Sequence, residues 1–184
     1  QSVDMLGYMY LKVGYGDVIP TTDLMSLYSA TDLRQNWFYV DGDYTYTSKY
    51  PGIEGGKAGV DNIPVTRLSE AYLNAAEANY ELGNEDLART QLDAIRQRAD
   101  ASAPASTETA GPLREKILLE RRKELAYEGH RFWDLKRRGL NIERVDLTVP
   151  NATATVVAGS NDFAYPIPQI EIEVNSNIVP NPGY

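Results

Sequence analysis

Apolar and small residues recur at helical spacing in the middle of the chain, most clearly over residues 68–82. Side chains three and four positions apart share one face of a helix, so this spacing predicts an amphipathic helix. Gly83 follows the segment directly, as expected where a helix ends. The residues expected to face inward are Leu68, Ala71, Tyr72, Ala75, Ala76, Asn79 and Leu82.

A second helix is predicted after this glycine turn, from about Glu85 to Ala99. Its inward positions are expected to be Leu87, Ala88, Leu92 and Ile95. The two helices predict a helical hairpin over residues 63–100. The small residues Ala76 and Ala88 favour a close approach of its two helices, as in a tetratricopeptide unit.

Charged residues dominate the next predicted helix, which starts at Pro112, a residue favoured at the first helical position. A link rich in Ala, Ser, Thr and Pro precedes it over residues 100–111. We expect helical structure over residues 112–139 with a break near Gly129. The apolar anchor that buries its last part is expected to be Phe132, Trp133 and Leu135. The alternative for Trp133 is an exposed platform on which a sugar stacks.

The two ends of the chain differ from this helical middle. Residues 1–62 are rich in glycine and tyrosine, and eight of the 13 tyrosines lie before residue 51. We predict a short helix over residues 21–30, then strands and long loops over residues 37–59. Residues 140–184 hold several prolines, which favour an extended tail wrapped over other structure.

These patterns predict a mainly α fold with long loops and little strand. One helical hairpin cannot bury its own outer faces, since repeat architectures need about three units. Either the other helices complete the stack, or preceding repeats lie outside this chain. We favour the second, and we then expect the helix over residues 68–82 to leave an apolar face uncovered.

Composition excludes several kinds of chemistry. There is no cysteine and a single histidine, His130, so disulfides, thiol catalysis and a zinc site of several histidines are not expected. The net charge of −8 disfavours nucleic acid. No apolar run approaches the roughly 20 residues that span a bilayer. We therefore expect no metal, no cofactor and no catalytic residue.

Three carboxylates, Glu120, Glu124 and Glu128, recur every four residues and share one face of the charged helix. As an acid and base pair they would suit a glycoside hydrolase, which needs two carboxyls across a sugar. The alternative is a structural network of ion pairs, because like charges at this spacing repel one another unless nearby cations neutralise them. We favour the network. The arginines expected to complete it are Arg67, Arg121 and Arg131.

Candidate ligand-binding residues lie in the aromatic first segment, where exposed rings and nearby polar groups would suit a carbohydrate. The aromatic residues in question are Trp37, Tyr39, Tyr44 and Tyr46. The competing interpretation is that alternate aromatic residues form the buried face of a strand.

Two runs of sequence carry a family resemblance. The first is Arg67-Leu-Ser-Glu-Ala-Tyr-Leu-Asn-Ala-Ala-Glu-Ala78, and the second spans Glu120 to Arg137 and includes His130-Arg-Phe-Trp-Asp-Leu-Lys136. Together with Asp32-Leu-Arg34 and the ending Asn181-Pro-Gly-Tyr184, they resemble the carboxy-terminal region of the SusD/RagB family. The resemblance implies a SusD-like α/α stack of tetratricopeptide-like helices across residues 1–184.

The resemblance also implies a function. Family members capture a glycan or another nutrient at the outer membrane and deliver it to a SusC-like TonB-dependent transporter, without cleaving it. Members are longer than this chain, so the lipid anchor is expected to lie outside it. Two rivals stay open: a tetratricopeptide-type protein-interaction module without a small ligand, and a glycoside hydrolase.

Overall fold

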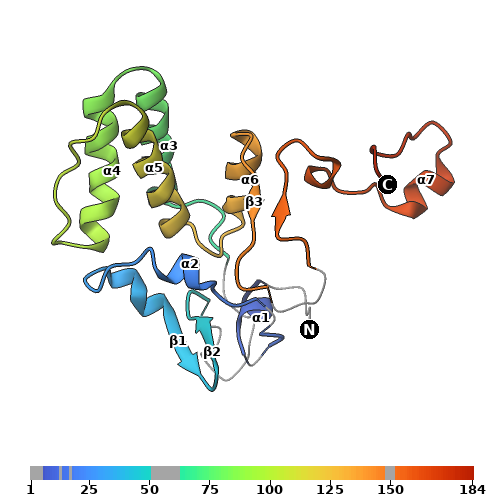
Figure 1. Cartoon of the computed structure of the whole chain (residues 1–184), viewed down its shortest axis with the longest axis horizontal. Coiled ribbons are helices and arrows are strands. Elements are labelled where there is room, and N and C mark those ends of the chain that lie inside the picture. The colour runs from blue at the N-terminus through green and yellow to red at the C-terminus, as the bar shows by residue number, and fades with distance from the viewer. Residues whose placement is uncertain (1–5, 13, 17, 51–62, 148–151) are drawn as a thin grey trace. The chain divides into compact units, whose positions relative to one another are not determined.

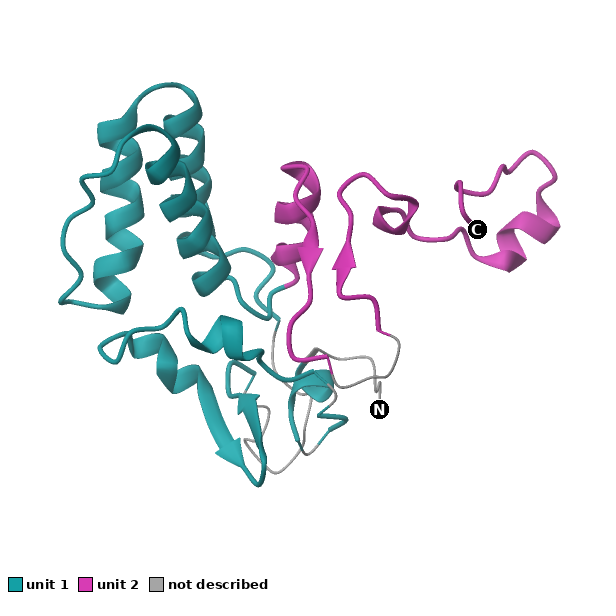
Figure 2. Cartoon of the chain, in the orientation of Figure 1, with its two compact units in different colours: residues 1–128 teal, residues 129–184 magenta. Residues whose placement is uncertain are grey.

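The computed structural model describes residues 6–12, 14–16, 18–50, 63–147 and 152–184. The chain forms two compact units, Gln1–Glu128 and Gly129–Tyr184 (Figures 1 and 2), and the boundary falls within the predicted charged-helix zone. Among the described residues, no helix combines the length and apolarity that crossing a bilayer requires.

Most of the regular structure is helical, and the strands form two small two-stranded sheets, which confirms the predicted mainly α fold. The elements of the first unit are α1 Leu6–Tyr10, α2 Thr22–Met25, the 3-10 helix η1 Leu33–Trp37, β1 Phe38–Asp41, β2 Tyr44–Thr47, α3 Leu68–Glu81, α4 Glu85–Ala99 and α5 Ala110–Glu124. Those of the second are α6 His130–Arg137, β3 Ile142–Glu143, β4 Thr155–Val156, the 3-10 helix η2 Asn161–Phe163 and α7 Gln169–Val174.

The core of the first unit lies between α3, α4 and α5 (Figure 1). α3 and α4 form the predicted hairpin, and Gly83 turns the chain between them in the left-handed conformation, with φ +79°. α5 packs against both helices. The side chains of the core are Leu73, Ala76, Ala88, Leu92, Ile95, Leu113 and Ile117. Each fully buried leucine contributes about 2 kcal/mol through removal of apolar surface from water.

The inward face of α3 differs from the prediction. Leu68, Tyr72 and Leu82 are exposed, whereas Leu73 and Glu77 are buried with Ala76. The helix is rotated because it must contact α4 and α5 at once, and alanines on several faces leave the local pattern ambiguous. The apolar face that remains uncovered thus includes the residues that the periodicity assigned to the core.

The aromatic segment forms a β-hairpin. β1 and β2 pair antiparallel, with Tyr39 opposite Tyr46 and Asp41 opposite Tyr44. Gly42 lies in the turn with φ +65°, at the first central position, where type II′ hairpin turns take glycine. The predicted strands therefore occur, but they span fewer residues than the expected segment, part of which lies outside the described residues.

In the second unit, the two aromatic residues of α6 differ in burial. Phe132 stacks on Phe163, with ring centroids 5.8 Å apart, and Leu135 is buried. Trp133, expected in the same anchor, is instead 56% exposed. The Trp133 ring meets Phe132 edge to face, with centroids 5.1 Å apart, while much of its surface stays open to solvent.

Candidate functional site

The β1–β2 hairpin gathers three of the four candidate aromatic residues on one face. Cross-strand partners lie on the same side of a sheet, and so do residues two apart along a strand. The pairing therefore places Tyr39, Asp41, Tyr44 and Tyr46 together. The rings of Tyr39 and Tyr46 are 5.7 Å apart, and Lys12 Nζ lies 2.6 Å from Asp41 Oδ1.

Exposure divides the four candidates. Tyr46 is 7% exposed, whereas Tyr39 and Tyr44 on the same face are 36% and 55% exposed. Trp37, at the end of η1, is half-buried, and Lys49 Nζ lies over its ring, 4.1 Å from the centroid. One face of the Trp37 ring is thereby occupied. Of the four candidates, Tyr39 and Tyr44 are therefore the rings most open to a ligand.

A buried ion-pair network centres on Glu124, whose side chain has no exposed surface. Its Oε1 accepts hydrogen bonds from Arg67 Nη1 at 2.5 Å and Arg98 Nη2 at 2.6 Å. Its Oε2 accepts from Arg34 Nη1 at 2.9 Å. Three guanidinium groups from α4, η1 and the residue before α3 thus meet one carboxylate at the end of α5.

Arg34 is the second centre of this network and is 3% exposed. It forms a two-point pair with Asp32, at 2.9 Å for Nε–Oδ1 and 2.8 Å for Nη2–Oδ2, and its Nη1 lies 2.6 Å from Glu120 Oε1. Lys123 Nζ also reaches Asp32, at 2.8 Å. Such charge-assisted, two-point pairs fix geometry as well as adding energy.

The carbonyls at the end of α5 are held by side chains distant in sequence. Lys49 Nζ donates to Glu124 O and Ala126 O, both at 2.9 Å, and Tyr50 OH donates to Tyr127 O at 2.9 Å. The last carbonyls of a helix have no partner within it, and cations are favoured there. The hairpin segment is thereby tied to the helical core.

Burial and ion pairing shift several pKa values in this network. Burial alone would raise the pKa of Glu124, but the hydrogen bonds from Arg67 and Arg98 outweigh it and lower the pKa to about 2. The same competition, with Arg34 and Lys123, lowers the pKa of Asp32 to about 2. Burial lowers the pKa of Lys49 to about 8, although Glu128 favours its charged form.

The other residues predicted for the ion-pair network differ in their contacts. Glu128 accepts from Arg67 Nε at 2.8 Å and pairs with Lys49. Arg121 donates to Asn74 Oδ1 at 2.6 Å and lies 3.9 Å from Glu77. Arg131 is an exposed residue of α6, in the second unit.

Sequence reasoning missed Arg34, Lys49 and Arg98 as members of the network. The segment Asp32-Leu-Arg34 belongs to the family resemblance, and this is the signal in the sequence that could have pointed to Arg34. Lys49 and Arg98 lie outside both runs that carry the resemblance, and nothing in their local sequence marks them as partners of the carboxylates.

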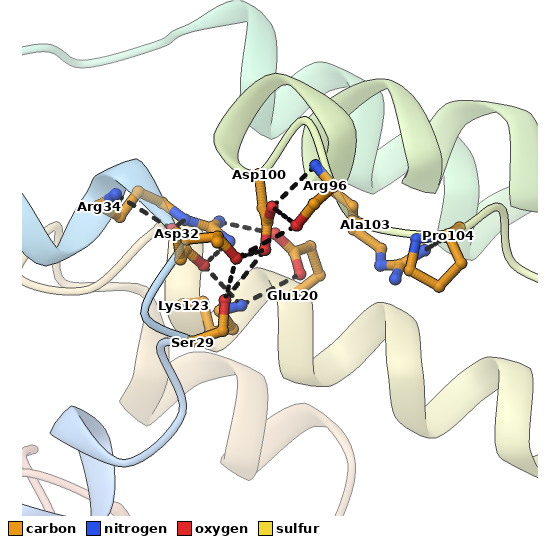
Figure 3. Close-up of a pocket in the computed structure, with 11 residues that line it drawn as sticks. Ser29, Asp32, Arg34, Arg96, Asp100, Ala103, Pro104, Glu120 and Lys123 are labelled. Atoms are coloured by element: carbon orange, nitrogen blue, oxygen red, sulfur yellow. Dashed lines mark hydrogen bonds and ion pairs between the residues drawn. The ribbon is translucent and has the colours of Figure 1, made fainter.

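A polar pocket of about 290 Å³ opens beside this network. Figure 3 shows its lining residues, which come from the loop after α2 with the start of η1, from the end of α4 with the following loop, and from α5. Asp100 stands at its exposed side, where its carboxylate accepts hydroxyl hydrogens from Ser29, Thr31 and Ser102 at 2.9, 2.7 and 2.6 Å. The hydroxyls of Ser102 and Thr31 hold the pKa of Asp100 well below its usual range.

Comparison with known proteins identifies the class. A model of the SusD family matches residues 35–184, so the chain belongs to that family. It is 30% identical over 181 residues to the starch-binding protein SusD of Bacteroides thetaiotaomicron, covering 96% of this chain and 30% of that protein. It is 32% identical to the SusD-like protein P2 of Formosa agariphila, covering 92% of this chain and 34% of that protein.

Two solved structures are similar to this chain over almost its whole length. A putative sugar binding protein from Bacteroides vulgatus superposes with a TM-score of 0.84 at 32% identity, covering 100% of this chain and 43% of that one. A SusD superfamily protein from the same species gives a TM-score of 0.87 at 29% identity, covering 99% and 43%. The chain spans about a third of the length of the curated relatives that it matches.

Proposed function

We propose that this chain is part of a surface protein that binds a glycan and delivers it to a SusC-like TonB-dependent transporter in the outer membrane, without breaking glycosidic bonds. Family membership supports the proposal, together with relatives described as starch-binding and sugar-binding. The protein would be held at the membrane by a lipid anchor outside this chain.

The exposed tyrosine pair on the hairpin is the structural feature that best supports glycan binding by this chain. Tyr39 and Tyr44 share a face with Asp41 and Lys12, which supply polar groups beside the rings. An aromatic ring covers the apolar face of a pyranose, while charged and amide groups orient its hydroxyls. Tyr46 and the strand pairing hold the rings in place, so little ordering is needed on binding.

Native gels that contain soluble polysaccharides test this proposal, with starch among them. The chain should be retarded by at least one polysaccharide, and the double variant Tyr39→Ala/Tyr44→Ala should lose the retardation. Tyr72→Ala is the matched control, since Tyr72 is 38% exposed on α3 and lies off the hairpin. Equal retardation of both variants would show that the hairpin is not the binding site. A parent chain that no polysaccharide retards would contradict glycan binding.

The carboxylates of α5 favour binding over hydrolysis. A glycoside hydrolase needs a general acid with a raised pKa in an open cleft. Glu120 and Glu124 are 4% and 0% exposed, both are paired with arginine, and the pKa of Glu124 is lowered. Neither is free to protonate a leaving group. Incubation with a retarding polysaccharide should therefore release no new reducing ends.

Delivery to a transporter is the part of the proposal that needs the whole protein. The full-length protein should co-purify from its own outer membrane with a TonB-dependent transporter, and deletion of either gene should abolish uptake of the bound glycan. Uptake that persists without this protein would contradict the delivery role. Binding to one extended peptide without any response to glycans would favour the interaction-module alternative.

A further inference from the structure

The pocket beside Asp100 has walls that are fixed independently of any ligand. Arg96 Nη1 donates to Pro104 O at 3.0 Å and to Asp93 Oδ1 at 2.6 Å, which pins the loop after α4. On the opposite side, Arg34 and Asp32 are locked into the buried network. A site with pre-formed walls loses little entropy when a ligand binds.

The charge of the pocket is balanced. Its lining holds three carboxylates, Asp32, Asp100 and Glu120, and three cations, Arg34, Arg96 and Lys123. The carboxylates would repel an anion, and the arginines and the lysine would repel a cation. Since both kinds of charge line one small space, a ligand without net charge fits it best.

The hydrogen-bonding groups of the pocket match a ligand with many hydroxyls. The carboxylate of Asp100 is fully engaged, since it accepts from the hydroxyls of Ser29, Thr31 and Ser102 and from the N–H of Ser102, whereas the three hydroxyl oxygens keep lone pairs that can accept from a ligand. A sugar hydroxyl both donates and accepts. Ala103 and Pro104 add a small apolar wall, against which the C–H face of a sugar ring can pack.

The size of the pocket limits the ligand to one ring. Sites for small molecules usually measure about 300–1,000 Å³, and this pocket, at about 290 Å³, lies at the lower end. We propose that it binds one neutral sugar residue, either free or at the end of a glycan. This inference rests on the proposed glycan-binding function, and the pocket is a separate site from the aromatic hairpin, since none of the lining residues belongs to β1 or β2.

Amide NMR spectra of the 184-residue chain, titrated with glucose, galactose and mannose, test the inference. At least one hexose should shift the amide signals of Ser29, Thr31, Ser102 and Ala103 together. Glucuronate and glucosamine are charged analogues of the same ring, and they should bind more weakly. Tighter binding of either analogue, or shifts confined to other residues, would overturn the proposal.

A matched pair of variants adds a control on the fold. Ala103→Phe fills the pocket, whereas Ala101→Phe makes the same change at an exposed residue that does not line it. Ala103→Phe should weaken hexose binding by about tenfold or more, and Ala101→Phe should leave it unchanged. Asp100→Asn provides a third variant, which keeps the shape of the side chain and should weaken binding by about tenfold, because the hydroxyls of Ser29, Thr31 and Ser102 lose the carboxylate that orients them.

The outcomes separate this inference from the proposed function. If polysaccharides retard the chain in gels but no hexose affects the pocket amides, the pocket proposal fails and the hairpin proposal stands. If Ala103→Phe and Ala101→Phe bind hexose equally, the pocket proposal also fails. If the chain binds neither polysaccharide nor hexose, both proposals fail.

Discussion

Replacement of Glu124 by glutamine tests the buried network directly. The carboxylate is fully buried and accepts from Arg34, Arg67 and Arg98. Glutamine keeps the size of the side chain but removes its charge, and its amide nitrogen would face an arginine donor. The three guanidinium groups would then share less negative charge, and the buried Arg34 could not replace it with water.

The expected cost is large for one substitution. Removing one partner of a buried ion pair costs about 3–5 kcal/mol, a large part of the roughly 5–15 kcal/mol by which a domain is stable. With a urea dependence of about 2 kcal/mol per molar, a loss of about 4 kcal/mol lowers the unfolding midpoint by about 2 M. Urea unfolding followed by far-UV circular dichroism measures this shift.

Glu81→Gln makes the same change at an exposed ion pair. Glu81 lies 2.7 Å from Arg114, and the two side chains are 49% and 43% exposed. Exposed pairs contribute about 0–1 kcal/mol, so this variant should unfold almost like the parent. A loss below about 1 kcal/mol for Glu124→Gln, or equal losses for both variants, would refute the reasoning from burial.

Three further predictions concern packing, acidity and the end of α5. Ala76→Leu should cost about 1–3 kcal/mol by overpacking the α3–α4 contact, whereas Ala78→Leu, at an exposed position, should be nearly neutral in thermal unfolding. The folded-state pKa values of Glu124 and Asp32 are lowered to about 2 from 4.5 and 3.8, so the stability they add is present above pH 4.5 and is lost as the pH falls towards 2. For Glu124 the loss amounts to roughly 3 kcal/mol, and urea midpoints measured across this range should decline less in Glu124→Gln than in the parent. Lys49→Met should destabilise the chain by about 1–3 kcal/mol, because Ala126 O loses the Lys49 donor and Glu124 O keeps only the hydrogen bond from Arg67, and a midpoint equal to that of the parent would contradict this role.

The helices could be predicted from the sequence because their signals are local. The spacing of apolar residues and the glycine at position 83 located the α3–α4 hairpin. The inward face of α3 could not be predicted in the same way. Leu68 and Leu82 satisfy the helical period, yet the contacts with α4 and α5 bury Leu73 and Glu77 beside Ala76, the one of these three that the pattern included. Tertiary packing decides between faces that the pattern leaves equivalent.

The candidate site shows the same division between local and distant information. The spacing of the carboxylates in α5 indicated that nearby cations must neutralise them. It could not indicate which cations, because Arg34, the most deeply buried partner of Glu124, lies 90 residues away. The strand pattern also could not separate the tyrosines: Tyr46 is covered and Tyr44, at the turn, is exposed, although both lie on one face of the same strand. The pocket beside Asp100 forms from three separate segments and has no pattern along the sequence.

Glycan binding by the chain itself is the central claim, and a glycan array probed with the labelled chain tests it most directly. The account predicts a saturable signal on at least one class of glycan, a signal that Tyr39→Ala/Tyr44→Ala reduces to background and Tyr72→Ala retains. An array on which the parent chain gives no signal above that of the double variant would contradict the account.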